Sequence, residues 1–465
     1  MTAAEPTPAF DTRHDKSFLG HPKGLGFLAF TEAWERFSYY GMQALLALYM
    51  VNALLKPDRV GNVAGIETLR ALFGGIDGQA FASAIFGAYT ACVYLTPILG
   101  GWIADRLLGT RRTLLLGALT MALGHFLMVF DVTFLAALVC LIVGSGLFKG
   151  NIASQVGALY GEGDNRRADA FQIFYLGINA GVIASPLIVG TLGEKVGWHW
   201  GFGAAGIGML ISIAIFLAGT KHLPPDPVKP ASGAPAAPRP AMTRDDWLAT
   251  GALLLLIPVL AIAVVPNNQI FNAYLVWGDR SFALEFMGTR LPTTWLVTLD
   301  AIVSVSFLAL VALFWRWWGK RFAEPDELGK LIIGSGFSIM GTLCLWAATA
   351  TTPEGAKIGL FWPMLFHVLN SIGFAHMLPV SLALFARLAP KAINATVIGL
   401  YYLAFFAGNS LVGWVGGWFE TMAPTRFWLM HTGFAVTAGA AFVVFKLFLS
   451  RRLFKRASAE DAALA

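Results

Sequence analysis

Three ionisable residues lie close together in an apolar stretch near the beginning of the chain. Glu32, Glu35 and Arg36 fall within residues 30–41. A charged side chain inside a bilayer costs roughly 3 kcal/mol or more unless it pairs or faces water, so such groups mark ion or substrate paths. Two carboxylates for one arginine favour proton chemistry, because the second acid is stabilised by binding a proton. The alternative is a structural Glu–Arg pair that joins two helices. On a helix the three charges share a face with Tyr39, Tyr40 and Gln43.

The composition predicts that this stretch lies in a membrane. Of the 465 residues, 57% are hydrophobic and only 13% are charged, with a mean hydropathy of +0.65, which is too apolar for a soluble protein. The polar first 25 residues lack the apolar region of a cleavable signal, so we expect the first apolar segment to direct insertion. The net charge of +6 is spread over short loops, which predicts membrane orientation and no nucleic-acid partner. Neither a disulfide framework nor a metal site is expected from Cys92, Cys140 and Cys344.

Apolar segments long enough to cross a hydrocarbon layer of about 30 Å recur along the chain. Lys and Arg concentrate in the loops on the side of both termini, which predicts that both termini are cytoplasmic. The sequence therefore predicts an all-α membrane protein with twelve transmembrane helices. We expect these at about residues 24–53, 79–105, 113–131, 134–158, 168–192, 199–219, 246–277, 292–318, 329–350, 358–388, 393–419 and 426–450.

A proline-rich segment divides these spans six and six. Residues 221–245 are too rich in proline for a helix and are predicted to form a mobile cytoplasmic linker. The domains are then an N-terminal six-helix bundle, 1–220, and a C-terminal six-helix bundle, 246–465. Two such halves indicate a transporter in which one half rocks against the other around a central site. A short surface helix is expected at 66–73.

The loop between the second and third spans carries a cluster of charges. Asp105 at a helix end, with Arg106, Arg111 and Arg112 nearby, can clamp one closed conformation through charge-assisted hydrogen bonds. The alternative is a basic loop that only sets the topology. Residues 101–112 resemble a signature of the major facilitator superfamily.

The first charged stretch resembles the first-helix motif of the proton-dependent oligopeptide transporters, the peptide transporter family of that superfamily. Further motifs occur in the family's order and extend over nearly the whole chain. The resemblance implies the major facilitator fold and a functional monomer in the cytoplasmic (inner) membrane, with protons as coupling ion and no cofactor. The motifs lie at 32–41, 93–106, 144–149, 174–181, 388–390 and 405–409.

Lys149 is a lone ammonium inside the fourth predicted span, so a partner carboxylate is expected. The resemblance implies that this lysine pairs with the first-helix carboxylates and takes part in coupling. With Glu32, Glu35 and Arg36 its charge sums to zero, and protonating one carboxylate would free a cation to attract a substrate anion. A purely structural ion cluster is the alternative.

The chain departs from the family where proton and substrate groups are expected. Gln43 stands where relatives often have an arginine that holds the peptide carboxylate, and Asn268 stands where many have a proton-accepting glutamate. Asp300 lies where many relatives have asparagine. We hypothesise that Asp300 replaces the missing proton site, since an aspartate in an apolar helix can bind protons reversibly. The alternative is an inert aspartate at a wet helix end.

The tenth and eleventh spans also differ. Phe374 occupies the position of the glutamate that receives a peptide's amino terminus, although its ring could still bind a cation with roughly 1–2 kcal/mol. His367 and His376 are nearby candidates for polar contacts, with packing as the alternative for both. Tyr401 replaces a tryptophan and lines the pocket or packs in the core.

We therefore predict a proton-coupled symporter that imports di- and tripeptides, with a small peptide and the lipid bilayer as its partners. Because both ends of the peptide clamp are altered, the alternative cargo is a modified peptide, an amino-acid derivative, another organic anion or a drug-like compound. An enzyme or receptor is not favoured, since the sequence shows no metal-spaced cluster, placed nucleophile or phosphate-binding loop. The predicted pocket residues are Tyr39, Tyr40, Gln43, Tyr94, Asn179, Asn268, Phe374 and Tyr401.

Overall fold

The apolar segments of the sequence form long helices in the computed structural model, which describes residues 12–161, 164–226 and 242–448. Each of the twelve predicted spans contains one of these helices. They are α1 (Lys23–Tyr49), α3 (Gly78–Ile103), α4 (Thr110–Leu127), α5 (Phe134–Ala158), α6 (Arg166–Ser185), α7 (Trp198–Gly219), α8 (Arg244–Asn268), α10 (Trp295–Gly319), α11 (Glu327–Thr351), α12 (Phe361–Leu388), α13 (Asn394–Gly416) and α14 (Pro424–Phe448).

Shorter elements extend or connect these helices. The predicted surface helix is confirmed as α2 (Ile66–Leu72), α9 (Ala273–Ser281) precedes a hairpin of β1 (Glu285–Phe286) and β2 (Thr289–Arg290), and Phe286 pairs with Thr289. The remaining turns are η1 (Met50–Leu54), η2 (Val60–Asn62), η3 (Ala104–Leu108), η4 (Asp131–Thr133), η5 (Pro186–Gly190), η6 (Leu192–Val196), η7 (Thr220–His222), η8 (Gln269–Phe271) and η9 (Lys391–Ile393).

Ten helical segments of the described chain are long and apolar enough to cross a membrane. The all-helical, multi-pass character predicted from composition is therefore confirmed. The other two long helices, α1 and α4, are less apolar because α1 carries Glu32, Glu35 and Arg36 and α4 begins with Arg111 and Arg112. Their assignment as spans remains a prediction.

The seventh predicted span, 246–277, is wrong as a single helix. α8 ends at Asn268 and α9 begins at Ala273, with Asn272 between them at φ −124° and ψ −109°. Pro266 removes a backbone donor one turn before the break. The Asn272 side chain donates to the Val412 carbonyl at 3.3 Å and so anchors the non-helical turn to α13.

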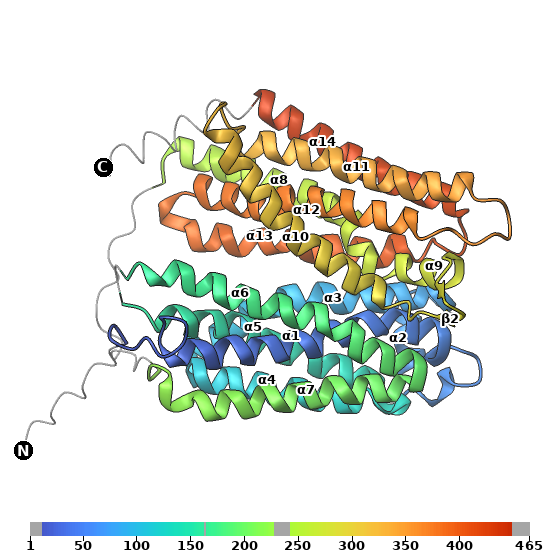
Figure 1. The fold of residues 1–465 in the computed structure, drawn as a ribbon, viewed down its shortest axis with the longest axis horizontal. Coiled ribbons are helices and arrows are strands. Elements are labelled where there is room, and N and C mark those ends of the chain that lie inside the picture. The colour runs from blue at the N-terminus through green and yellow to red at the C-terminus, as the bar shows by residue number, and fades with distance from the viewer. Residues whose placement is uncertain (1–11, 162–163, 227–241, 449–465) are drawn as a thin grey trace, which may run out of the picture.

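Figure 1 shows the helices in two groups, with α1 and α3–α7 on one side and α8–α14 on the other. In the N-terminal group, α1 packs on α6 and α7, α4 packs on α5 and α7, and α3 packs on α5. In the C-terminal group, α8 packs on α13 and α14, α11 packs on α12 and α14, and α10 packs on α12. The second set repeats the first, six long helices later, which supports the predicted two-bundle organisation.

The two groups meet mainly through α3 with α13 and α6 with α10. Gly87 of α3 and Gly413 of α13 allow the first pair to approach closely. A Cβ atom on Gly87 would lie 2.4 Å from the Cα of Gly413, so only glycine fits there. Beside this crossing, the Ser83 hydroxyl donates to Asn272 Oδ1 at 3.0 Å.

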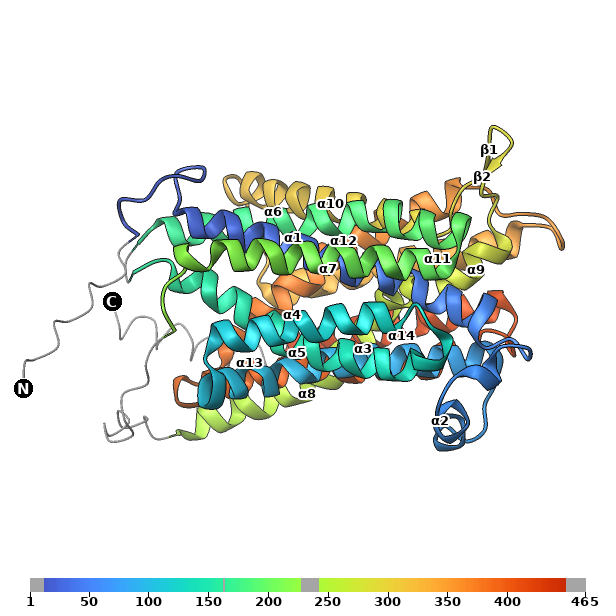
Figure 2. The ribbon, with the colours of Figure 1, turned by 90° about the horizontal axis from the view of Figure 1, so that it is seen from below.

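The long helices run between two ends of the molecule (Figures 1 and 2). At the linker end lie the described N-terminal residues, η7 and the beginning of α8. At the hairpin end lie α2, α9 and the β1–β2 hairpin. Residues 227–241 of the predicted linker lie outside the described residues.

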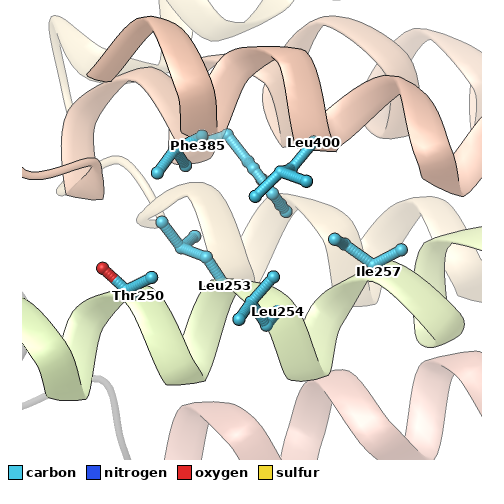
Figure 3. Close-up of a pocket in the computed structure, with 7 residues that line it drawn as sticks. Thr250, Leu253, Leu254, Ile257, Phe385 and Leu400 are labelled. Atoms are coloured by element: carbon cyan, nitrogen blue, oxygen red, sulfur yellow. The ribbon is translucent and has the colours of Figure 1, made fainter. Parts of the chain in front are cut away.

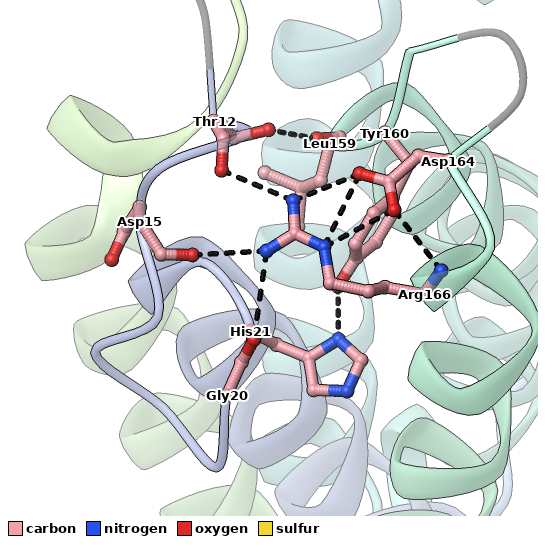
Figure 4. Close-up of polar contacts among 8 residues, drawn as sticks. All are labelled: Thr12, Asp15, Gly20, His21, Leu159, Tyr160, Asp164 and Arg166. Atoms are coloured by element: carbon pink, nitrogen blue, oxygen red, sulfur yellow. Dashed lines mark hydrogen bonds and ion pairs between the residues drawn. The ribbon is translucent and has the colours of Figure 1, made fainter.

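Arg166 ties the segment before α1 to the turn between α5 and α6 at the linker end (Figure 4). Its guanidinium pairs with Asp164 at 2.8 Å and donates to the carbonyls of Thr12 at 3.3 Å and Asp15 at 3.2 Å. The hydrogen bond from Arg166 lowers the pKa of the Asp164 carboxyl, so the ion pair persists at neutral and mildly acidic pH. This contact fixes where α1, and the charged residues on it, enter the bundle.

Candidate functional site

The three charges of α1 form one buried cluster. Arg36 Nε lies 2.7 Å from Glu32 Oε1 and 3.2 Å from Glu35 Oε2. The helix itself makes this possible, because residues four apart are neighbours. Glu35 is fully buried, and within the part of the chain that the structure describes neither of its oxygens nor Glu32 Oε2 has a hydrogen-bond partner. Buried carboxylate oxygens without a donor are costly when ionised, so the cluster is suited to binding a proton.

Lys149 does not form the predicted ion pair. Among the described residues no carboxylate oxygen lies within 4.0 Å of its ammonium, which instead lies 4.0 Å above the ring of Tyr39. The cation paired with both first-helix carboxylates is Arg36. The charges of Glu32 and Glu35 still reach Lys149 electrostatically, so the four charged groups belong to one site.

Tyrosines from both helix groups gather next to the charges. Tyr40 of α1 packs edge-on against Tyr39 with ring centroids 5.3 Å apart, and Tyr94 of α3 stacks on Phe405 of α13 with ring centroids 5.2 Å apart. Two further tyrosines, Tyr175 of α6 and Tyr402 of α13, are 58% and 41% exposed. We call Tyr40, Tyr94, Tyr175 and Tyr402 the tyrosine cluster.

Tyr175 was not predicted as a site residue, whereas Tyr402 was considered with Tyr401 as an aromatic wall that lines the pocket or packs in the core. Tyr175 has a sequence signal, since it lies one turn before Asn179, whose side chain donates to the Tyr175 carbonyl at 2.9 Å. The structure supports the packing alternative for Tyr401, which is 2% exposed. Its hydroxyl pairs with Ser381 at 2.9 Å, so the neighbouring Tyr402 presents the accessible ring.

Gln43, Asn179 and Phe374 take different positions around these groups. Gln43 is buried on α1, and no described residue donates to its Oε1, which leaves an acceptor on the charged face. Asn179 is partly exposed on α6, and Phe374 is partly exposed on α12. Their roles as substrate contacts remain predictions.

Asn268 belongs to a chain of amides that joins three helices of the C-terminal group. Its side chain donates to Asn409 of α13 at 3.2 Å and accepts from Asn267 at 3.3 Å. Asn370 of α12 donates to Asn267 at 2.8 Å. Asn267, Asn370 and Asn409 were not predicted here, although asparagines inside apolar spans signal a polar role. An amide chain positions polar groups and holds no proton charge.

Asp300 lies in the second turn of α10 and has a defined partner. His367 Nδ1 lies 2.9 Å from Asp300 Oδ1, and His367 Nε2 lies 3.0 Å from the Tyr274 hydroxyl. The Asp300 side chain is 15% exposed and that of His367 is fully buried. An inert aspartate at a wet helix end therefore does not describe this residue.

His376 differs from His367, because its partners fix it as a packing residue. Trp315 Nε1 donates to His376 Nε2 at 3.1 Å, and Nδ1 faces the Ile372 carbonyl at 2.8 Å. A nitrogen that accepts from an indole carries no proton of its own, so this ring is neutral.

Glu194 of η6 connects the two helix groups at the hairpin end. Its carboxylate accepts the backbone N–H groups of Thr293 and Thr294, each at 2.8 Å, and the Thr294 hydroxyl at 2.7 Å. These donors lie at the beginning of α10, where a negative charge is stabilised by the helix dipole. Asn52 also donates to Asp279 at 3.0 Å across the groups. The hairpin end is thus closed by polar contacts, and we call the Glu194 contacts the α10 latch.

Among the described residues, Asp105 makes no ion pair with Arg106, Arg111 or Arg112 in this conformation, so the clamp stays a prediction. Asp105, Arg106 and Arg112 are exposed. Arg111 donates its backbone N–H to Asp226 at 3.1 Å and its guanidinium to the Leu223 carbonyl. At the linker end, the beginning of α4 therefore contacts the beginning of the linker.

Two hollows in the described structure lie away from the charged cluster. One is a narrow apolar crevice between α8, α12 and α13 (Figure 3), lined by Leu253, Ile257, Phe385 and neighbours. Its one polar side chain, Thr250, bonds to its own helix. The other is a groove of about 390 Å³ between α3 and α13 near the hairpin end. Both are lined mainly by apolar groups, so neither suits a peptide.

Two packed groups of apolar helices, with buried charges between apolar surfaces, define a membrane transporter of the major facilitator type. The POT family profile matches residues 111–234. The chain is 30% identical over 469 residues to the uncharacterized transporter YclF of Bacillus subtilis, covering 89% of this chain and 91% of that protein. It is 28% identical over 529 residues to the peptide transporter YePEPT of Yersinia enterocolitica, covering 97% and 99%.

A solved structure shows the same fold. The crystal structure of peptide transporter POT in complex with sulfate superposes with a TM-score of 0.82 at 26% identity, covering 96% of this chain and 98% of that one. The chain belongs to the POT family of transporters.

Proposed function

We propose that the protein is a proton-coupled symporter that imports di- and tripeptides across the cytoplasmic (inner) membrane by alternating access. The buried cluster of Glu32, Glu35 and Arg36 beside Lys149 carries this proposal. A site for an uncharged solute has no need of two buried carboxylates with two partly buried cations, whereas proton and carboxylate binding both use them. In this proposal both termini are cytoplasmic, and one chain with two halves forms the whole site as a monomer.

Proton uptake can change the charge of the cluster and prepare it for substrate. When a proton binds Glu32 or Glu35, Arg36 and Lys149 keep two positive charges against one remaining carboxylate. The excess positive charge attracts the carboxylate of a peptide. Release of the proton restores the neutral cluster and weakens the hold on the peptide, which couples the two flows.

The conformation fits one end state of alternating access. The α10 latch and the Asn52–Asp279 contact close the hairpin end, which is the predicted outer face. For a peptide to enter from outside, these contacts must break. We propose that Asp105, Arg106, Arg111 and Arg112 form their clamp in the opposite state.

A second candidate keeps proton coupling and changes the cargo. Two substitutions favour it. Gln43 and Phe374 stand where the family usually has the charged residues that bind the two ends of a peptide. A modified peptide, an amino-acid derivative, another organic anion or a drug-like compound would depend less on those charges.

Uptake of radiolabelled dialanine into proteoliposomes after a pH jump tests the proposal. The native protein is expected to take up more dialanine with an inward proton gradient, and Glu32→Gln and Lys149→Ala are each expected to reduce this uptake roughly tenfold or more. Glu354→Gln and Lys320→Ala are matched controls, since both residues are exposed, and should behave like the native protein.

Two results would contradict the proposal. Dialanine uptake that does not depend on the proton gradient would contradict proton coupling. Absence of dialanine uptake by folded native protein would remove the peptide cargo and leave the second candidate.

A further inference from the structure

The chain of Asp300, His367 and Tyr274 crosses three elements of the C-terminal group and is unused by the mechanism above. Asp300 lies on α10, His367 on α12 and Tyr274 on α9. His367 and Tyr274 are fully buried. A histidine is suited to reversible protonation in this setting because its ordinary titration range spans physiological pH.

Protonation of His367 changes the net charge of the Asp300–His367 pair. With a neutral imidazole, the Asp300 carboxylate is a negative charge held by one hydrogen bond of 2.9 Å. With a protonated imidazole, the two groups form a neutral ion pair. The proton therefore cancels the net charge of this buried pair.

Both protonation states keep all the hydrogen bonds of His367. In the neutral state Nδ1–H donates to Asp300 and Nε2 accepts from the Tyr274 hydroxyl. In the charged state Nε2–H donates to the same hydroxyl oxygen, because a phenol is both donor and acceptor. A proton can therefore enter and leave without leaving a buried nitrogen of His367 unpaired.

The groups named here that pack around Asp300, His367 and Tyr274 are neutral or lie at the beginning of α10. Asp300 is therefore the counter-ion of His367. On α11, the neutral thiol of Cys344 donates to the Trp362 carbonyl at 3.5 Å. On α14, His431 is held between the Phe427 carbonyl and Gln269. The amides of Asn267 and Asn370 on α8 and α12 are neutral. The charged group that the N-terminal group brings to α10 is Glu194, at the first turn of that helix.

The position of Asp300 connects the proton to the contact between the helix groups. The turn of α10 before Asp300 is fixed to the N-terminal group by the α10 latch, and Thr298 donates to the Ile183 carbonyl at 3.1 Å. The Asp300–His367 bond joins the next turn to α12. A change of charge at this bond alters how firmly α10 is held by its own group.

We propose that His367 is a proton acceptor of the C-terminal group, with Asp300 as its counter-ion and Tyr274 as the hydroxyl that orients it. The proposal rests on the proposed proton coupling and deepens it by naming a second proton-binding residue. It also replaces the hypothesis that Asp300 acts alone with a shared site.

Proton binding is tested directly on the full chain in nanodiscs with ¹⁵N-labelled histidine. The His367 signal is assigned by its loss in His367→Gln. An imidazolium pattern is expected to appear as the pH is lowered, and Asp300→Asn should reduce the imidazolium signal of His367 relative to the native protein. A His367 signal that stays neutral throughout, or titrates identically in Asp300→Asn, overturns the proposal.

Transport measurements distinguish a failure of the His367 proton site from a failure of the proposed peptide cargo. His367→Gln is expected to lose gradient-driven dialanine uptake roughly tenfold while retaining dialanine counterflow, which needs no net proton movement. His376→Gln is the matched control, because His376 is a buried histidine on the same helix with neutral partners. Equal loss in both variants, or none in His367→Gln, overturns the assignment. Absence of dialanine counterflow in the native protein instead refutes peptide transport. The ¹⁵N measurement of His367 then still decides whether this residue binds a proton.

Discussion

Lys149 and Tyr39 show how one partly buried cation is stabilised without an adjacent carboxylate. The ammonium lies 4.0 Å from the ring centroid, a geometry worth about 2 kcal/mol when the pair is desolvated. The ring face attracts the cation while its charge remains available to a substrate anion. A direct salt bridge would have held the cation more firmly and made it harder to release.

Substitutions of Tyr39 can separate the ring from its hydroxyl. Tyr39→Phe keeps the aromatic face and is expected to retain most gradient-driven dialanine uptake. Tyr39→Leu removes the face and should lower uptake roughly tenfold, the equivalent of about 1.4 kcal/mol. Initial uptake rates at saturating and limiting dialanine measure the effect. Similar rates in Tyr39→Leu and Tyr39→Phe would show that the ring does not hold Lys149 during transport.

The sequence predicted the charged residues of the site better than their partners. Glu32, Glu35 and Arg36 are neighbours on any helix, so their cluster followed from spacing alone. The contact of Lys149 with Tyr39 depends on how α5 packs against α1, which no local pattern encodes. The same holds for His367 and Asp300, which are far apart in sequence and were considered separately.

At the scale of elements, the beginning of α10 is held by a residue of the other group. Glu194 accepts three hydrogen bonds from Thr293 and Thr294. These hydrogen bonds are charge-assisted because their acceptor is a carboxylate, and the helix dipole of α10 stabilises that negative charge. The latch therefore favours the conformation in which the hairpin end is closed.

Glu194→Gln is expected to shift the population toward an open hairpin end. The amide keeps the side-chain shape but loses the charge and one accepting oxygen, at a cost of about 1–2 kcal/mol. Electron-electron distance measurements between spin labels at Lys56→Cys and Met287→Cys, in a background without native cysteines, should show more long distances. The exposed Glu285→Gln is the control. An unchanged distance distribution in Glu194→Gln would show that the latch does not set this equilibrium.

Helix positions were predictable because long apolar runs have few other structures available in a membrane. The break between α8 and α9 was missed, since the apolar run continues through it and only Pro266 and the following amides signal a turn. The π-helical turns η1, η3, η5 and η6 extend neighbouring helices and have no distinct pattern in composition. The contacts of Glu194 were likewise invisible, because they join segments about 100 residues apart.

At the scale of the whole molecule, the two helix groups repeat the same packing order. Each group pairs its equivalent helices in the same way, and the groups meet at α3 with α13 and α6 with α10. Such repeats create a site between two bodies that can rock against each other. The tyrosine cluster and Phe405 draw on both groups, so a bound substrate would contact both halves.

Cargo choice is a property of this shared site, and the altered peptide clamp makes it testable. We expect several unrelated dipeptides to block dialanine uptake, because amides and tyrosines can recognise the common backbone. Phe374 offers a peptide's amino group at most about 1–2 kcal/mol of cation–π attraction, so N-acetyl-dialanine should compete within roughly tenfold of dialanine. Phe374→Glu adds a charge for the free amino group and should widen that difference. If dipeptides fail to compete while a small organic anion does, the specialised cargo replaces the peptide.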